Sequence, residues 1–491
     1  MAAPETEKQI VWFWAKMLKW VHIHLIIFLV LFTSHVLPSS IVKSLPGFSG
    51  SLPFRLETGY VVVDEKEDVQ FFYYYVESEG NPRDDPLMFW FTGGPGCSAL
   101  CGLAFEIGPI KFNMVEYNGS LPTLVLNPYS WTKATSIIFV DAPVGTGFSF
   151  SRSLEGVQTG DSVYAKRTLN FLRMWLLAHP EFSSHPLYLG GDSFSGIIIP
   201  IIAEEIAKST EANQILGINL QGYVLGNPAT NIELDGNSKV EFAHRMALIP
   251  DELYRSVKKT CKGQYTATHK YDSLCAKDLE AISVCTENLS EGYVLDPNCY
   301  RYMSDNDQKM DDNRRSLLEN PFKRNPFQRS LNFGFPPLEN PKFGCRNYVN
   351  KLVYHWANDK TVQEALHIQK GTIKTWIRCD RNLPYMHQVD NVVSYHKRLN
   401  SRGYRALIYS GDHDMMIPYI GTQAWIKSLN LPISGQWRPW IVDDEVAGYV
   451  TEYSKGSFTF ATVKGGGHTA PEYYPKECLA MFKRWISQEP L

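Results

Sequence analysis

Short apolar runs recur along the chain, and each ends abruptly in a turn rich in glycine or aspartate. Runs of this length that carry β-branched and aromatic residues are typical of buried strands. The stretches between some of them have the apolar spacing of helices. The predicted strands are 87–91, 137–140, 187–189, 223–225, 406–409 and 458–463, and the predicted helices include 160–179 and 197–208. This alternation predicts an α/β fold with a mostly parallel central sheet flanked by helices, with functional residues beyond the strands' carboxyl ends.

The N-terminus has the layout of a secretory signal peptide. Lys16 and Lys19 precede an apolar run over 20–37, which ends at Pro38-Ser39-Ser40. We therefore predict a signal peptide within 1–40. The alternative is an uncleaved anchor, because the run nearly reaches the length that spans a bilayer. Contact with a membrane is expected only in that second case.

Passage through the secretory pathway changes how two other features are interpreted. Two sequons, at Asn118 and Asn288, become candidates for glycosylation. The cysteines become candidates for disulfides rather than metal ligands. Cys97 and Cys101 lack a second Cys/His pair at zinc-finger spacing, so no metal site is predicted.

The pattern changes between 231 and 345, which we interpret as a helical, disulfide-bearing insertion, or cap. Four cysteines, at 261, 275, 285 and 299, precede a polar, basic tract over 304–341, which is predicted to be an exposed loop that is either cleaved or left intact. The insertion would separate an N-terminal part of the main fold, 41–230, from a C-terminal part, 346–491.

Composition narrows the classes of function. Of 491 residues, 44% are hydrophobic and 20% charged, which excludes a wholly disordered chain. The 51 acidic and 48 basic residues leave a net charge of −3, so a nucleic-acid partner is not expected. The count of nine cysteines is odd, so at least one is unpaired within the chain.

Ser193 lies in a sequence that predicts a nucleophile elbow. Residues 190–196 read Gly-Gly-Asp-Ser-Phe-Ser-Gly and fall between a predicted strand and a predicted helix. A sharp turn in that context exposes a serine hydroxyl, and small neighbours allow the bend. Ser195 stands where the usual motif has its second glycine.

An acid and a histidine follow in the order typical of α/β-hydrolases. A turn after 406–409 contains Asp412 and Asp414, and His468 follows 458–463 in a glycine-rich turn. Serine needs a histidine base, and that histidine needs a carboxylate to fix its tautomer. The residues predict a Ser-Asp-His triad in an α/β-hydrolase fold, but they do not choose between the two aspartates.

The turn at 92–97, Thr-Gly-Gly-Pro-Gly-Cys, is a candidate oxyanion hole. Its glycines allow backbone N–H groups to aim at one point, so the N–H groups of Gly94 and Phe194 are the expected donors. The alternative is a tight turn that binds nothing.

Four motifs together resemble the serine carboxypeptidase-like proteins of plants. They are Gly93-Gly-Pro-Gly-Cys97, Gly191-Asp-Ser-Phe-Ser-Gly196, Gly411-Asp-His-Asp414 and Gly465-Gly-Gly-His468, and the resemblance spans about 45–491. It implies that Asp414 is the triad acid. It also implies the disulfides Cys97–Cys345, Cys261–Cys275 and Cys285–Cys299, which leave Cys101, Cys379 and Cys478 free.

The family contains carboxypeptidases and acyltransferases. Its carboxypeptidases hold a peptide's terminal carboxylate with an Asn, where this chain has Thr92, and a Glu, where it has Asp192. Glu106 matches a further Glu of that set. Thr92 lacks an amide donor and Asp192 is shorter by one methylene, so both changes should weaken capture of a peptide terminus.

Other segments resemble the acyltransferase branch, which moves an acyl group from a 1-O-β-acylglucose to an acceptor hydroxyl. They include 56–60, 222–228, His413 and the stretch 468–472, whereas Phe194 replaces the family's usual Tyr. The resemblance thus implies an acyl-glucose donor, a hydroxyl acceptor, no cofactor, and a vacuolar rather than extracellular location. A serine carboxypeptidase is the alternative, and a catalytically silent secreted or anchored binding protein a remote one. The expected substrate contacts are Thr92, Gly93, Glu106, Asp192 and His413.

Overall fold

The structure is a computed structural model that describes Trp14, Met17 and residues 39–211, 218–266, 273–299 and 343–491. Apart from Trp14, Met17, Ser39 and Ser40, the predicted signal or anchor segment lies outside the described residues, as does the predicted loop 304–341. Within the part that is described, no helix has both the length and the apolar character needed to cross a membrane.

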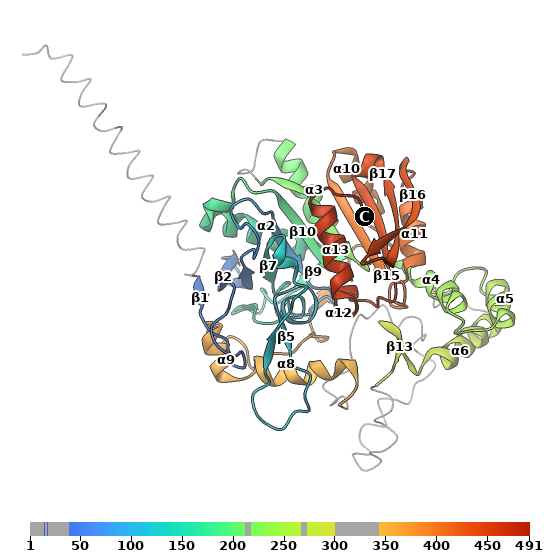
Figure 1. Ribbon diagram of the computed structural model, residues 1–491, viewed down its shortest axis with the longest axis horizontal. Helices are drawn as coiled ribbons and strands as arrows, with labels where there is room; N and C mark the ends of the chain where they lie inside the picture. Colours follow the sequence, from blue (N-terminus) through green and yellow to red (C-terminus); the bar gives the residue numbers. More distant parts are fainter. Residues whose placement is uncertain (1–13, 15–16, 18–38, 212–217, 267–272, 300–342) are drawn as a thin grey trace, which may run out of the picture.

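A twelve-stranded mixed sheet forms the centre of the molecule (Figure 1). Its six inner strands, in the order β7-β4-β10-β11-β15-β18, are parallel, and each contains one of the six predicted strands. The α/β-hydrolase fold is thus confirmed. In spatial order the strands are β1 (Ser40–Val42), β2 (Leu56–Asp64), β3 (Val69–Val76), β7 (Ser136–Val140), β4 (Leu87–Phe91), β10 (Leu187–Asp192), β11 (Leu220–Gly226), β15 (Arg405–Gly411), β18 (Phe458–Val463), β17 (Glu445–Tyr453) and β16 (Ile433–Val442), with β8 (Phe150–Ser151) beside β3.

Each face of the sheet is buried under its own helices. Strand β4 shows why its sequence is continuously apolar: Met88 and Trp90 belong to one core cluster, whereas Leu87, Phe89 and Phe91 belong to the other. Such two-sided burial is usual for parallel strands. The first cluster includes α8 (Val349–Ala357) and α13 (Pro475–Ile486); the second includes α2 (Asp161–Ala178), α3 (Ser195–Glu211), α10 (Val393–Ser401) and α11 (Tyr419–Ser428).

Antiparallel strands extend the sheet at both margins and are not among the predicted strands. On one side of the sheet β3, β2 and β1 lie outward from β7 in that order, and on the other side β17 and β16 lie outward from β18. Other short elements in the described part of the chain are η1 (Gly102–Glu106), β5 (Ile110–Phe112), β6 (Leu124–Leu126), η2 (Trp131–Lys133), β9 (Thr159–Gly160), η3 (Pro180–Phe182), η7 (Arg346–Tyr348), α9 (Lys360–Ala365), β14 (Tyr385–Met386), η8 (Ser454–Gly456) and α12 (Ala470–Tyr473).

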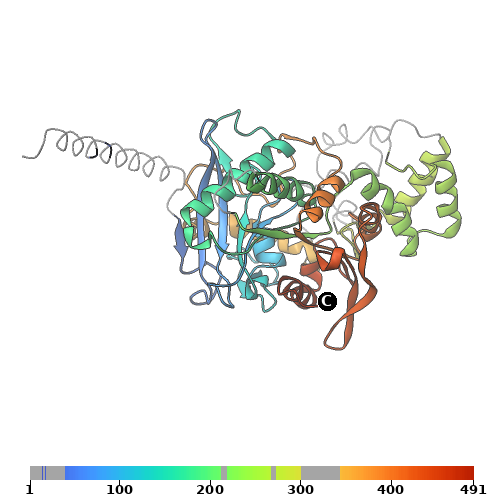
Figure 2. The same ribbon diagram turned by 90° about the horizontal axis from the view of Figure 1, so that it is seen from above.

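The segment that follows β11 contains α4 (Ile232–Arg245), α5 (Asp251–Thr260), α6 (Ser273–Thr286) and a hairpin of β12 (Leu289–Ser290) and β13 (Tyr293–Pro297). Its helices share a separate apolar cluster that includes Val240, Val257 and Ile282. Helix α4 packs against α11, while α5 and α6 project at one end of the molecule (Figures 1 and 2). The segment is helical, as expected. Its assignment as a cap domain remains a prediction, as does glycosylation of the exposed Asn118 and Asn288.

The disulfides correct the predicted pairing. Cys261–Cys275 is present as expected, but Cys97 pairs with Cys379 and Cys299 pairs with Cys345. The predictions of Cys97–Cys345, of Cys285–Cys299 and of a free Cys379 are therefore wrong. The backbone explains the first error, because Cys97 and Cys379 face each other in an antiparallel bridge although 282 residues separate them. The free cysteines among the described residues are Cys101, Cys285 and Cys478.

This pairing predicts a selective thiol reaction. Cys285 is exposed on α6, whereas Cys101 and Cys478 are buried, and burial raises the pKa of both of these thiols. A maleimide should therefore modify one site, Cys285, in the native protein and two more after unfolding, because reactivity follows exposure and thiolate content. Mass spectrometry of the digested protein measures both stages. Native labelling of Cys379 or Cys345, with Cys285 protected, would contradict the pairing.

Candidate active site

Ser193 occupies a sharp turn between β10 and α3, as the elbow predicted. Its φ is 53°, a left-handed conformation that is uncommon outside glycine. The flanking glycines permit the bend, because a Cβ on Gly191 would lie 2.4 Å from the Phe91 carbonyl oxygen. Ser195, the departure from the usual motif, donates its hydroxyl to that same oxygen at 2.6 Å. The turn is thereby braced against β4, and Ser193 is left at the strand end.

The structure brings together the three residues of the predicted triad. His468 Nε2 lies 2.8 Å from Ser193 Oγ, and His468 Nδ1 lies 2.8 Å from Asp414 Oδ2. Asp414 is fully buried and also accepts hydrogen bonds from Asn227 Nδ2 at 2.8 Å and from the Met416 N–H at 2.8 Å. A fully buried carboxylate with these donors is held as an acceptor. It therefore favours the histidine tautomer with its proton on Nδ1, which leaves Nε2 to accept from serine.

The two candidate aspartates have different partners. Asp412 Oδ1 accepts the Gly465 N–H at 2.7 Å and lies 2.6 Å from His413 Nδ1. Asp412 thus ties the turn after β15 to the turn after β18. His413, an expected substrate contact, directs its Nδ1 to Asp412 instead. Among the two acids, it is Asp414 that contacts His468.

The charges around His468 raise its pKa. Burial alone would lower the pKa, but the charge and hydrogen bond of Asp414 outweigh burial. Asp192 adds to the increase, and Lys239 of α4 opposes it. The charges of Asp414, Asp192 and Lys239 therefore act together on the pKa of this ring.

The glycine turn after β4 lies against the elbow. A Cβ on Gly93 would lie 2.5 Å from Ser193 Cβ and 3.0 Å from the Phe194 nitrogen, so only glycine allows this approach. Gly94 has φ of 126°, again a conformation suited to glycine. Thr92 is buried, and its Oγ1 has no hydrogen-bond partner among the described residues. The two predicted oxyanion donors thus belong to adjoining turns.

Buried carboxyl groups surround this turn. Asp192 Oδ1 accepts the Gly93 N–H at 2.9 Å, and Glu106 lies in the buried helix η1. Burial raises the pKa of Asp192, partly opposed by His468, the Gly93 N–H and Arg378. Burial and the charges of Asp192 and Glu472 raise the pKa of Glu106 well above its ordinary value, with Arg378 acting in the opposite sense. The ionisation of Glu106 therefore depends on that of Asp192.

Sequence reasoning missed the segment 376–389, which passes beside these residues. Its Cys379 is bonded to Cys97, and the Arg378 carbonyl accepts the Ser98 N–H at 2.8 Å, so the charge of Arg378 reaches Asp192 and Glu106. Tyr385 packs on the ring of Phe194 at 5.6 Å. The one signal for this segment was its cysteine. Asn227 was also missed, although it lies in a polar turn directly after a predicted strand.

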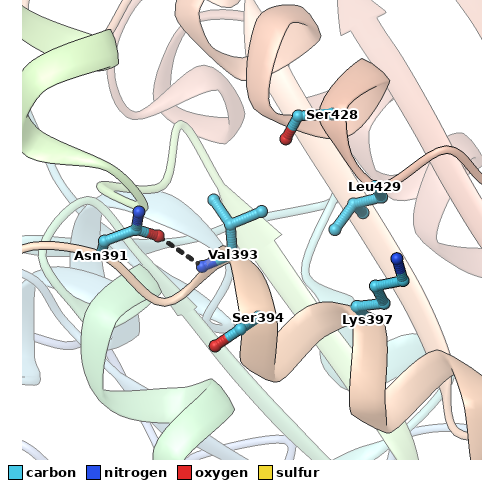
Figure 3. A pocket seen from close by; sticks show the side chains of 6 residues that line it. All are labelled: Asn391, Val393, Ser394, Lys397, Ser428 and Leu429. Carbon is cyan, nitrogen blue, oxygen red and sulfur yellow. Dashed lines mark hydrogen bonds between the residues drawn. The ribbon is translucent and has the colours of Figure 1, made fainter.

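A metal centre and a surface recess are the remaining candidates for a site. Among the described residues, no group of three or more His, Cys, Asp or Glu is arranged to hold a metal ion. A surface recess of about 440 Å³ lies between α10 and α11 and contains none of the residues above (Figure 3). It is lined by Asn391, Val393, Ser394, Lys397, Ser428 and Leu429.

The fold, with a serine after β10, an aspartate after β15 and a histidine after β18, defines the α/β-hydrolase class. The sequence matches the serine carboxypeptidase family over residues 46–488, and the chain belongs to that family. Similar curated proteins from Arabidopsis thaliana include serine carboxypeptidase-like 2, 48% identical over 457 residues (93% of this chain and 94% of the relative), and serine carboxypeptidase-like 13, 44% identical over 468 residues (95% and 98%).

A solved structure confirms the fold independently. Kex1(delta)p, a prohormone-processing carboxypeptidase from Saccharomyces cerevisiae, matches with a TM-score of 0.68 over 93% of this chain and 96% of that one. At 19% identity the likeness concerns the fold alone. The protein is thus an enzyme of the serine carboxypeptidase family, which acts on small-molecule or peptide substrates.

Proposed function

We propose that this enzyme transfers an acyl group from a 1-O-β-acylglucose to an acceptor hydroxyl through an acyl-serine intermediate. The observation that carries the proposal is the hydrogen-bonded chain from Ser193 through His468 to Asp414, at 2.8 Å for each contact. A serine so activated attacks esters and then passes the acyl group on. With Asp414 as the orienting acid, His468 is the base and Ser193 the nucleophile.

The proposed reaction has two halves. In the first, Ser193 Oγ attacks the ester carbonyl while its proton moves to His468 Nε2, and the N–H groups of Gly94 and Phe194 stabilise the oxyanion. The intermediate collapses as His468 returns the proton to the anomeric oxygen, and glucose leaves. In the second half, His468 takes the proton of the acceptor hydroxyl, whose oxygen attacks the acyl-serine. Ser193 recovers its proton when the product ester departs.

The residues around the glycine turn favour a sugar ester over a peptide terminus. Thr92 offers a hydroxyl where the family's carboxypeptidases have an amide, and Asp192 is already engaged by the Gly93 N–H at 2.9 Å. Burial raises the pKa of both Asp192 and Glu106, and a carboxyl group can hydrogen-bond a hydroxyl in either protonation state. Such groups suit the hydroxyls of a neutral sugar, and we assign both as contacts to glucose.

A specific observation also supports the alternative, a serine carboxypeptidase. Two carboxyls with raised pKa values beside the charge of Arg378 suit the carboxylate of a peptide terminus in acid. Peptide substrates therefore belong in any test. The three disulfides fit the oxidising secretory pathway, and we place the enzyme in the vacuole on the family resemblance.

The test compares transfer with peptide release in the same preparation. The purified protein, given a panel of 1-O-β-acylglucoses and alcohol acceptors, is expected to form new esters, whereas peptides should lose their C-terminal residues slowly. Efficient trimming of peptides without transfer would overturn the proposal. A fluorophosphonate that fails to label the protein would favour a catalytically silent binding protein.

The double substitution Thr92→Asn with Asp192→Glu restores the residues of the family's carboxypeptidases. We expect it to raise the ratio of peptide release to transfer by about tenfold or more, because polar complementarity controls discrimination between substrates. Parallel assays of kcat/KM on an acylglucose and a peptide measure this ratio. Thr92→Val is the control: it removes the hydroxyl without supplying an amide, so it should not increase peptide release. An unchanged ratio in the double variant would contradict the assigned roles of Thr92 and Asp192.

A further inference from the structure

The β12–β13 hairpin contacts both turns that carry His468 and Asp414. The Gly292 carbonyl accepts the His468 N–H at 2.7 Å, and the Glu291 carbonyl accepts the Met415 N–H at 2.8 Å. The Val294 N–H donates to the His413 carbonyl at 3.1 Å. The consecutive residues Glu291 and Gly292 of one hairpin thus fix the position of the histidine turn relative to the aspartate turn.

Two ion pairs hold this hairpin in place, one at each of its ends. From α4, Lys239 Nζ lies 3.1 Å from Glu291 Oε2, and the Lys239 side chain is only 8% exposed, against 40% for Glu291. At the other end, Asp296 accepts from Arg346 at 3.2 Å, next to the Cys299–Cys345 disulfide. Of these two ion pairs, Lys239–Glu291 therefore lies nearer to the backbone hydrogen bonds between the hairpin and the two turns.

We propose that Lys239 and Glu291 are positioning residues, which set the register of the hairpin on the Asp414 and His468 turns and place a positive charge beside His468. This inference rests on the proposed function, since it assumes that His468 is the base. Burial of a lysine is costly unless the charge is paired. The partner, Glu291, directly precedes Gly292, whose carbonyl accepts the His468 N–H. The ion pair with Lys239 therefore affects the backbone position of His468.

The charge of Lys239 opposes a field made mostly by carboxylates. Lys239 lowers the pKa of His468, against the increase caused by Asp414 and Asp192. Asp235, one turn earlier on α4, and Glu291 both face Lys239 and moderate its charge. The ionisable groups on the elements packed around His468 include Asp414, Asp412 and His413 after β15, Asp192 on β10, Glu291 and Tyr293 on the hairpin, Glu472 and Tyr473 on α12, and Asp235 and Lys239 on α4.

Removing the positive charge of Lys239 and removing the negative charge of Glu291 should therefore shift the pH profile of the reaction in opposite directions. The serine reacts when His468 is neutral, so the rate rises with pH through the histidine's pKa. Lys239→Met removes a positive charge, and the rising limb should move to higher pH by about half a unit. Glu291→Gln leaves Lys239 less neutralised, and the limb should move to lower pH by about the same amount. Both should lower the plateau rate about threefold or more as the hairpin loosens.

The experiment measures the rate of fluorophosphonate labelling of Ser193 from about pH 4 to about pH 9 in the full-length protein and both variants. Lys239→Arg keeps the charge and serves as the matched control, with an unshifted limb expected. Thermal unfolding by circular dichroism identifies folded variants, and the more exposed Glu291 provides a second route if Lys239→Met does not fold. Unshifted limbs, or shifts in the same direction, would overturn the inference. A wild-type protein that is not labelled would instead reject the proposed function.

Discussion

Replacing Ser193 with alanine is expected to lower acyl transfer more than about a thousandfold, because the substitution removes the oxygen that becomes acylated. Alanine lacks only the hydroxyl and has the same backbone preference, so the strained φ of 53° adds no new cost. Ester formation from an acylglucose and an alcohol, followed by chromatography, measures the loss. Fluorophosphonate labelling should disappear in parallel.

Ser195→Ala is the matched control, two residues away in the same turn. Its hydroxyl donates to the Phe91 carbonyl and contacts neither His468 nor Asp414. Losing that bond should cost about 1 kcal/mol of unfolding free energy and leave most of the transfer activity. Substantial transfer by the Ser193→Ala protein, or an equal loss in both variants, would show that the nucleophile lies elsewhere.

Asp414→Asn is expected to lower the rate on the order of 10⁴-fold while the fold persists. An asparagine amide at this position donates to His468 Nδ1, and the ring then carries its proton on Nε2. That nitrogen can no longer accept the proton of Ser193. Steady-state kinetics at a pH above the histidine's pKa measures the effect, since protonation of the ring then does not obscure the wrong tautomer.

Asp412→Asn provides the comparison that separates the two acids of the same turn. Asp412 bonds to the Gly465 N–H and to His413, not to His468. We expect its substitution to lower the rate less than about tenfold, through a looser contact between the turns. A larger loss from Asp412→Asn than from Asp414→Asn would contradict the assignment.

Local sequence patterns predicted the parts of the fold that depend on local chemistry. The run 87–91 is apolar at every position because both faces of the strand are buried, so its sequence predicts a strand, and the turn that follows needs glycine for its approach to Ser193. The antiparallel strands at the two margins of the sheet depend on pairing with neighbouring strands, and the turn residues of the sequence do not predict that pairing. The hairpin β12–β13 likewise reveals its place only through backbone bonds to Met415 and His468.

The features of the site that the sequence does not predict depend on contacts between residues far apart in the chain. The residues alone do not choose between Asp412 and Asp414; the family resemblance implies Asp414, and the structure places that carboxylate against His468. No local pattern links Cys97 to Cys379, so the sequence does not indicate that the neighbouring Arg378 lies near the site. Cysteine identity restricts the set of possible bonds but does not select one of them.

The acyl-enzyme itself gives the most direct test of the central claim. The wild-type protein is mixed with a 1-O-β-acylglucose, quenched in acid within milliseconds to seconds, and analysed by mass spectrometry. We predict a mass increase of one acyl group on the peptide that contains Ser193, which disappears when an alcohol acceptor is added and a matching amount of the new ester forms. No acylation at Ser193, or loss of the acyl group only to water with the acceptor present, would contradict acyl transfer as the function of this site.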